Sequence, residues 1–97
     1  MFVTGPTSAS RGTVATFDVF VNKTSSNLKT TLYIDITSPG GYEHFDTLNV
    51  TLSSGSGGRY YFTWQIPNTL APGTYQVTVG LIPAKAASFS QTQVNIT

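Results

Sequence analysis

Residues 14–21, VATFDVFV, carry the pattern that decides the fold. Phe17 and every second residue up to Val21 are apolar, whereas Thr16, Asp18 and Phe20 occupy the positions between them. Successive side chains of a β-strand point to opposite faces, so this alternation predicts a strand with one buried face and one outward face. The rest of the chain can be interpreted by extending the same pattern in both directions.

The alternation recurs at five further places along the chain, and turn-forming Gly, Pro, Ser and Asn separate them. A shorter extended segment lies within Phe2–Ala9, where Pro6 interrupts it. No window repeats apolar residues with helical spacing over three turns. The Ala-rich segment Leu81–Ser88 is short and contains Pro83, which favours a loop. The longer predicted strands are residues 14–21, 31–37, 45–52, 60–66, 73–81 and 89–96.

About seven short strands with clean alternation favour two antiparallel sheets that bury their apolar faces against each other. Without crossover helices a doubly wound parallel sheet is disfavoured. We therefore predict one all-β sandwich domain over residues 1–97, with a closed barrel as the alternative architecture.

The chain carries few charges, with 9% charged residues, a net charge of +1 and no Cys. Nucleic-acid binding requires a clustered basic patch, and here the basic residues are scattered singly. No apolar run is long enough for a transmembrane helix, so we expect no membrane insertion. Polarity comes from hydroxyl and amide side chains, which favours an extracellular or cell-surface setting within a larger secreted protein. We also expect a monomer. The basic residues are Arg11, Lys23, Lys29, Arg59 and Lys85.

Two segments, TWQIP at residues 63–67 and LAPGTY at residues 70–75, resemble the late strands of immunoglobulin-like and fibronectin type III-like modules of bacterial secreted proteins. Residues 6–12 and 14–22 resemble the opening strands of the same modules. The resemblance implies an immunoglobulin-like antiparallel β-sandwich of about seven strands, with a structural role for Tyr75. Trp64 falls on the inward face of its predicted strand, which also indicates a structural role. Tyr75 resembles a tyrosine corner. Because such modules often accompany polysaccharide-active enzymes, the resemblance also implies a non-catalytic accessory module.

Candidate chemistry is sparse. His44 lies beside Glu43 and close to Asp46, a combination that could form an acid–base pair or a metal site, although a charged cluster next to a turn is more typical of a solvated loop. Asp18 and Asp35 fall on outward faces, but no Asp-rich loop supplies the six or more oxygens that calcium prefers. We expect no enzyme activity, no cofactor and no metal site.

Aromatic side chains are the stronger indication of a function, because 12% of the residues are aromatic. Alternation places Phe20, Tyr33 and Tyr61 on outward faces, and Tyr42 follows a Gly-rich turn. Exposed rings can stack on the apolar faces of sugar rings, while nearby hydroxyls and amides bond to sugar hydroxyls. We predict that these four residues bind polysaccharide weakly.

Two other functions fit the same surface. The domain could be a structural spacer whose exposed rings pack on a neighbouring domain of the parent chain. It could also be a cell-surface adhesion repeat that recognises another protein. The amino-acid sequence leaves these alternatives open.

Overall fold

The computed structural model describes residues 1–21, 28–53, 55, 57–82 and 89–97. The described residues form eight strands, and they contain no helix that could cross a membrane. The six longer predicted strands are all found within three residues of their expected bounds. The strands are β1 (Phe2–Thr4), β2 (Ser8–Ala9), β3 (Val14–Val21), β4 (Leu28–Thr37), β5 (Glu43–Leu52), β6 (Gly58–Gln65), β7 (Gly73–Ile82) and β8 (Phe89–Ile96).

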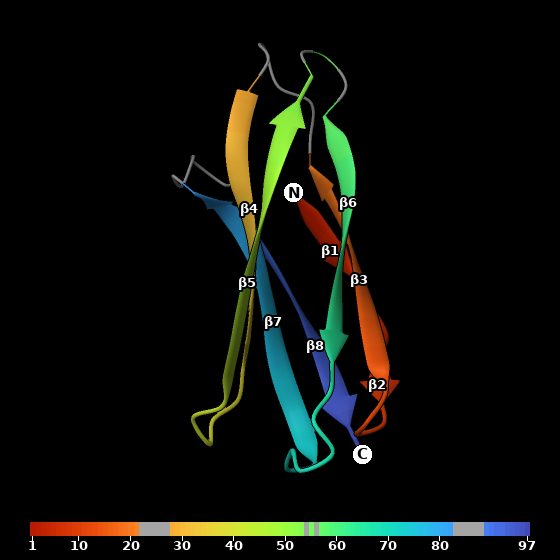
Figure 1. Ribbon diagram of the computed structural model, residues 1–97. Helices are drawn as coiled ribbons and strands as arrows, with labels where there is room; N and C mark the ends of the chain where they lie inside the picture. The colour runs from red at the N-terminus through yellow and green to blue at the C-terminus, as the bar shows by residue number, and fades with distance from the viewer. Residues whose placement is uncertain (22–27, 54, 56, 83–88) are drawn as a thin grey trace.

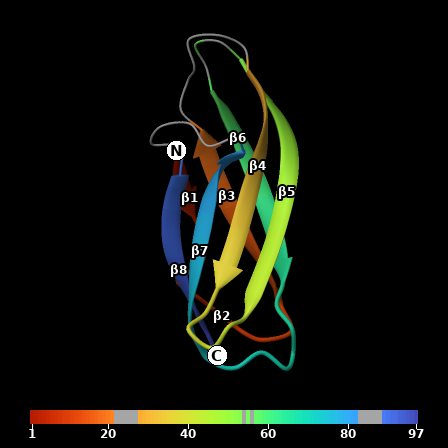
Figure 2. The same cartoon turned by 90° about the vertical axis from the view of Figure 1, so that its left-hand side faces the viewer.

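The strands form two sheets that pack face to face (Figure 1). The smaller sheet has the order β1-β3-β6, and the larger has the order β2-β8-β7-β4-β5. In Figure 2 the larger sheet faces the viewer, and the smaller sheet lies behind it. The two sheets remain separate and open, so the molecule is a β-sandwich and the alternative of a closed barrel is wrong.

The first predicted strand is divided between the two sheets. β1 pairs with β3, and the chain then crosses at Gly5 and Pro6 to the larger sheet, where β2 pairs with β8. A Cβ atom at residue 5 would lie 2.4 Å from the Phe17 ring, so this crossing requires glycine. β2 and β8 run in the same direction, so this pair is parallel. It is the exception to the antiparallel arrangement that the sequence predicts.

Alternation in the sequence becomes alternation in burial. β3 buries residues 15, 17, 19 and 21, and β7 buries Tyr75 and the following odd-numbered residues up to Leu81. The inner faces of both sheets supply one continuous cluster of buried apolar side chains, in which Trp64 and Phe17 are the largest fully buried members. The buried side chains among the described residues are all aliphatic or aromatic, so the hydrophobic effect holds the two sheets together.

β5 departs from the predicted pattern in two ways. It begins at Glu43, so Glu43 and His44 belong to a strand and not to a solvated loop. Leu48 has the same phase as the buried Val50 and Leu52, yet it is 38% exposed. β5 is the outer strand of a five-stranded sheet that faces only three strands, so part of its inner face is left uncovered.

Candidate functional site

Three aromatic side chains lie on the outer face of the larger sheet, and we call Tyr33, Phe45 and Phe89 the aromatic platform. Tyr33 lies opposite Gly80 on β7, and Gly80 in turn lies opposite Phe89 on β8. Phe45, on β5, stacks on Tyr33 with 5.7 Å between ring centroids and 21° between ring planes. Phe45 is 52% exposed and Phe89 is 61% exposed, so both rings are open to a ligand.

Gly80 allows the Tyr33 ring to lie close to the sheet. A Cβ atom at residue 80 would lie 2.6 Å from Cε2 and 2.7 Å from the hydroxyl of Tyr33. An aromatic ring that covers a glycine on the neighbouring strand shields its backbone and holds the ring in place. The Tyr33 ring is therefore positioned across the sheet before any ligand arrives.

Hydrogen-bonding side chains border the platform along the same strands. Gln91 Nε2 donates to Thr78 Oγ1 at 3.1 Å, and Gln93 Nε2 donates to Gln76 Oε1 at the same distance. These pairs join β7 to β8 on the outer face and leave further donor and acceptor sites for a polar ligand.

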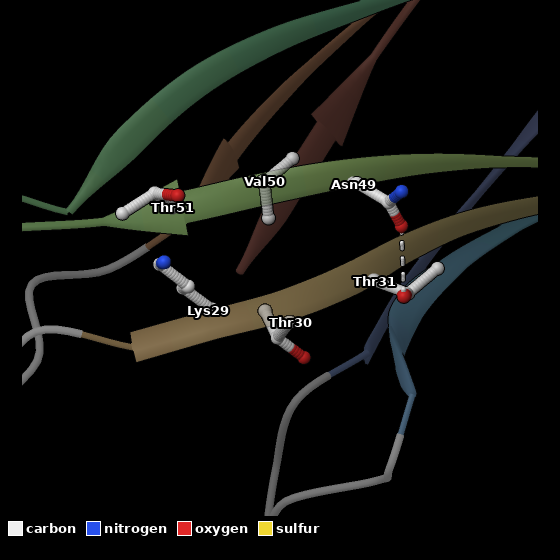
Figure 3. Close-up of a pocket in the computed structure, with 6 residues that line it drawn as sticks. All are labelled: Lys29, Thr30, Thr31, Asn49, Val50 and Thr51. Atoms are coloured by element: carbon white, nitrogen blue, oxygen red, sulfur yellow. Dashed lines mark hydrogen bonds between the residues drawn. The ribbon is translucent and has the colours of Figure 1, made fainter.

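A hollow of about 370 Å³ lies beyond the platform along β4 and β5 (Figure 3). Thr31 Oγ1 donates to Asn49 Oδ1 at 3.3 Å, and this opposed pair is the next outward pair along β4 and β5 from Tyr33 and Thr47. The hollow contains no aromatic ring, so it extends the polar margin of the platform and is not a separate site. It is lined by Lys29, Thr30, Thr31, Asn49, Val50 and Thr51.

Two carboxyl groups lie beside the stacked rings. Asp35 is directly opposite Phe45, and Glu43 is opposite Thr37, so the two acids are diagonal neighbours on the outer face. A hydrogen bond with Asp35, reinforced by repulsion from the Asp35 charge and by desolvation, raises the pKa of Glu43 above its usual value. Asp35 Oδ1 is buried and has no hydrogen-bond partner among the described residues.

The outer face of the smaller sheet carries a second aromatic group. Phe20 and Tyr61 are exposed, and Asp18, directly opposite Tyr61, lies two residues before Phe20 on β3. The Arg59 guanidinium binds both oxygens of Asp18, with Nε 3.0 Å from each, and this lowers the pKa of the Asp18 carboxyl. The ring of Phe2, on β1, borders the same hollow as Phe20 and Arg59. This face therefore carries aromatic rings around a neutralised ion pair.

Tyr42 is placed differently from the other three predicted binding residues. Its hydroxyl accepts a hydrogen bond from Trp64 Nε1 at 3.2 Å, and its ring meets Tyr75 edge-on at 5.7 Å between centroids. Tyr42 is half-buried against the core and bridges the start of β5 to β6. The structure thus gives Tyr42 a packing role and separates it from the aromatic platform.

The two residues expected to be structural are both buried. Trp64 is 1% exposed, and the Tyr75 hydroxyl donates to the Ala71 carbonyl at 2.7 Å, which ties β7 to the loop before it. This is the contact that a tyrosine corner makes.

The candidate acid–base and metal residues do not assemble. The His44 ring stacks on Trp64, with 6.3 Å between centroids, and faces inward, whereas Glu43 faces outward. Asp18 and Asp35 lie on different sheets. Across the described ranges no three His, Cys, Asp or Glu side chains come together as metal ligands.

Sequence reasoning missed Phe45 and Gly80, which complete the platform around Tyr33. The signal for Phe45 was its phase, which is opposite to that of Val50 and Leu52 and therefore outward. The pairing of Tyr33 with Gly80 depends on the β4–β7 register, which local alternation does not reveal.

Comparisons with known proteins identify the fold. The chain superposes on a crystal structure of a CARDB domain from Pyrococcus furiosus, described in complex with di-metal ions, with a TM-score of 0.77 and 14% identity over 99% of this chain and 84% of that one. The solution NMR structure of the same CARDB domain gives a TM-score of 0.72 at 14% identity over 99% of this chain and 91% of that one. The fold is immunoglobulin-like. No protein-family profile and no curated protein matches the sequence.

At 14% identity this likeness establishes the fold and no more. The immunoglobulin-like module that the sequence predicts is confirmed.

Proposed function

We propose that this immunoglobulin-like domain is a non-catalytic accessory module of a larger extracellular protein, and that it binds polysaccharide weakly through the aromatic platform. One observation carries the proposal: the Tyr33 ring lies against Gly80 and stacks on Phe45, while Phe45 and Phe89 remain more than half exposed. The domain acts as a monomer, and no bond is made or broken.

The chemistry of the platform suits a sugar. A pyranose ring has an apolar face that packs on an aromatic ring and equatorial hydroxyls that point sideways. On this surface the hydroxyls would meet Thr78, Gln91 and, further along the strands, Thr31 and Asn49. Stacking supplies the binding energy, and the amides and hydroxyls fix the orientation.

Binding should be weak because the platform is open. A typical pocket covers most of its ligand, whereas a flat sheet face covers only one side of it. We expect a dissociation constant on the order of 1 mM per site, which corresponds to about −4 kcal/mol. Several such modules, or a catalytic domain on the same chain, would strengthen attachment through effective concentration.

Affinity electrophoresis through gels that contain cellulose derivatives, xylan, β-glucan or starch tests the proposal. We expect at least one polysaccharide to retard the domain, and Tyr33→Ala, Phe45→Ala or Phe89→Ala to restore its mobility. Tyr61→Ala is the matched control, since Tyr61 is a similarly exposed ring, 58% accessible, on the other sheet. Unchanged mobility in every gel contradicts glycan binding, and retardation lost only in Tyr61→Ala places the site on the smaller sheet.

A second function is favoured by the smaller sheet. Phe2, Phe20 and Tyr61 surround the Asp18–Arg59 pair, so this face exposes aromatic area without an unbalanced charge. Such a face suits packing against a neighbouring domain, as a spacer requires. If a domain covers it, Tyr61→Lys should lower the melting temperature of the parent chain while leaving that of the isolated domain unchanged. If the parent chain with Tyr61→Lys melts at the same temperature as the unchanged parent chain, the spacer role is contradicted.

A further inference from the structure

The aromatic platform has an unbalanced negative charge at one end. Asp35 and Glu43 are two of the four acidic residues in the chain, and both face outward beside the Tyr33–Phe45 stack. The ion pair found among the described residues, Asp18–Arg59, lies on the other sheet. Neither acid of the platform pairs with a basic side chain in the part of the chain that the structure describes.

No described cation lies close enough to neutralise this end. On β4 the outward basic residue is Lys29, six residues from Asp35 and therefore about 20 Å away along the strand. The outward residues of β7 and β8 next to Asp35 are Thr78 and Gln91, which carry no charge. Tyr33 is the other titratable side chain on the outer face beside the pair, and His44 faces inward.

The acids repel each other, and one carboxyl oxygen lacks a partner. Their proximity raises the pKa of Glu43, first through the hydrogen bond with Asp35 and then through charge repulsion. The buried Asp35 Oδ1 accepts no hydrogen bond from the described residues. An ammonium group that donates a hydrogen bond to the exposed Glu43 carboxylate would relieve the repulsion and lie close to the charge of Asp35.

We infer that the ligand of the platform is a cationic glycan, a polymer of amino sugars whose ring stacks on Tyr33 and Phe45 while its ammonium group binds Asp35 and Glu43. This inference rests on the proposed function and specifies its substrate class. The Cβ atoms of directly opposed residues lie about 5 Å apart, so a group on the edge of a sugar stacked on Phe45 is within reach of Asp35. The aromatic faces also attract the cation.

The same geometry favours an amino sugar over a lysine-rich peptide. In an amino sugar the ammonium group is fixed to a rigid ring, and the ring itself covers the aromatic surface. A lysine side chain would lose the conformational entropy of its four rotatable bonds on being fixed and would offer no flat face to Tyr33. Acidic polysaccharides would be repelled by Asp35 and Glu43.

Two oligosaccharides of equal length test the inference: a fully deacetylated glucosamine oligomer and its fully N-acetylated counterpart. Titrations followed by NMR at low ionic strength should show about tenfold tighter binding of the deacetylated form, equivalent to about 1.4 kcal/mol. The preference should shrink as salt is added, because the ion pairs are exposed. The pH is chosen so that the amines are protonated and the carboxyls are ionised.

Isosteric variants assign the preference to the acidic pair. In Asp35→Asn/Glu43→Gln the deacetylated and acetylated forms should bind equally, through stacking alone. Asp46→Asn is the matched control, because Asp46 lies on the same strand but on the inner face, and it should keep the tenfold preference. Thermal unfolding of each variant confirms that the sandwich is intact.

The outcomes separate the two proposals. Equal binding of both oligosaccharides by the wild-type protein overturns the inference and leaves glycan binding standing. No binding of either oligosaccharide, together with no retardation by any polysaccharide, overturns both. Binding of oligolysine that needs Asp35 and Glu43 but survives Phe45→Ala also overturns the inference, because the site would then recognise a cationic peptide.

Discussion

The two outer faces of the sandwich carry similar rings in different electrostatic surroundings. On the smaller sheet Phe20 and Tyr61 flank Asp18, whose charge Arg59 neutralises through two oxygens. On the larger sheet Tyr33 and Phe45 flank Asp35 and Glu43, which have no described basic partner. Aromatic content alone therefore does not mark a binding face. This difference in charge balance is the basis for proposing a packing face on the smaller sheet and a cationic ligand on the larger one.

The largest loss of stability should come from a substitution in the core that joins the two sheets. Trp64→Ala should lower the free energy of unfolding by about 3–5 kcal/mol, since Trp64 is almost fully buried and packs on Tyr42 and Tyr75. Because both sheets rest on this side chain, both faces should be lost together in denaturant. Hydrogen exchange that shows one sheet protected after the other has opened would contradict a shared core.

Gly80→Ala should act on the larger sheet only. The new Cβ would overlap the Tyr33 ring, and we expect a loss of about 1–3 kcal/mol in denaturant unfolding. Adding Tyr33→Ala should recover part of this loss, which a double-mutant cycle measures. Thr74→Ala, on the same face of β7, is the control and should cost less than about 0.5 kcal/mol. Additive effects of the two substitutions would mean that Tyr33 does not lie over Gly80.

Asp18→Asn should remove the charge balance of the smaller sheet. Arg59 lowers the pKa of Asp18 in the folded state, so the ion pair stabilises the protein above the ordinary carboxyl pKa and is lost as the pH falls through the lowered one. The variant should be slightly less stable than the wild type at neutral pH, and the difference should disappear in acid. Denaturant midpoints at both pH values measure it, and a difference that persists in acid would assign the loss to packing.

Glu43→Gln should have the smallest effect on stability, and it should stabilise the domain where the other substitutions destabilise it. The pKa of Glu43 is raised in the folded state, so protonated Glu43 favours folding. This contribution to stability is fully present below the ordinary carboxyl pKa and is lost as the pH rises through the raised pKa. The variant has no charge to repel Asp35, and it should be slightly more stable than the wild type at neutral pH and equal to it in acid. Asp46→Asn is the control on the inner face of β5. A destabilised Glu43→Gln at neutral pH would mean that the pair is not repulsive.

Much of the fold could be predicted from the sequence, and less of the site. The strand positions and the outward placement of Phe20, Tyr33 and Tyr61 follow from alternation, because the two-residue period of a strand is a local property of the backbone. Tyr42 could not be placed in this way. It precedes β5, and its packing on Trp64 depends on how the two sheets meet.

The sequence by itself determined an all-β sandwich with buried Trp64 and Tyr75, because alternation and turn residues act over a few neighbouring positions. Only the tertiary structure decided which outward residues become neighbours. Strand register brought Phe45 and Gly80 to Tyr33, left Asp35 beside Glu43, and gave Asp18 its Arg59. These contacts join residues distant in the chain, and they are set by the packing of the whole sheet and not by any single segment.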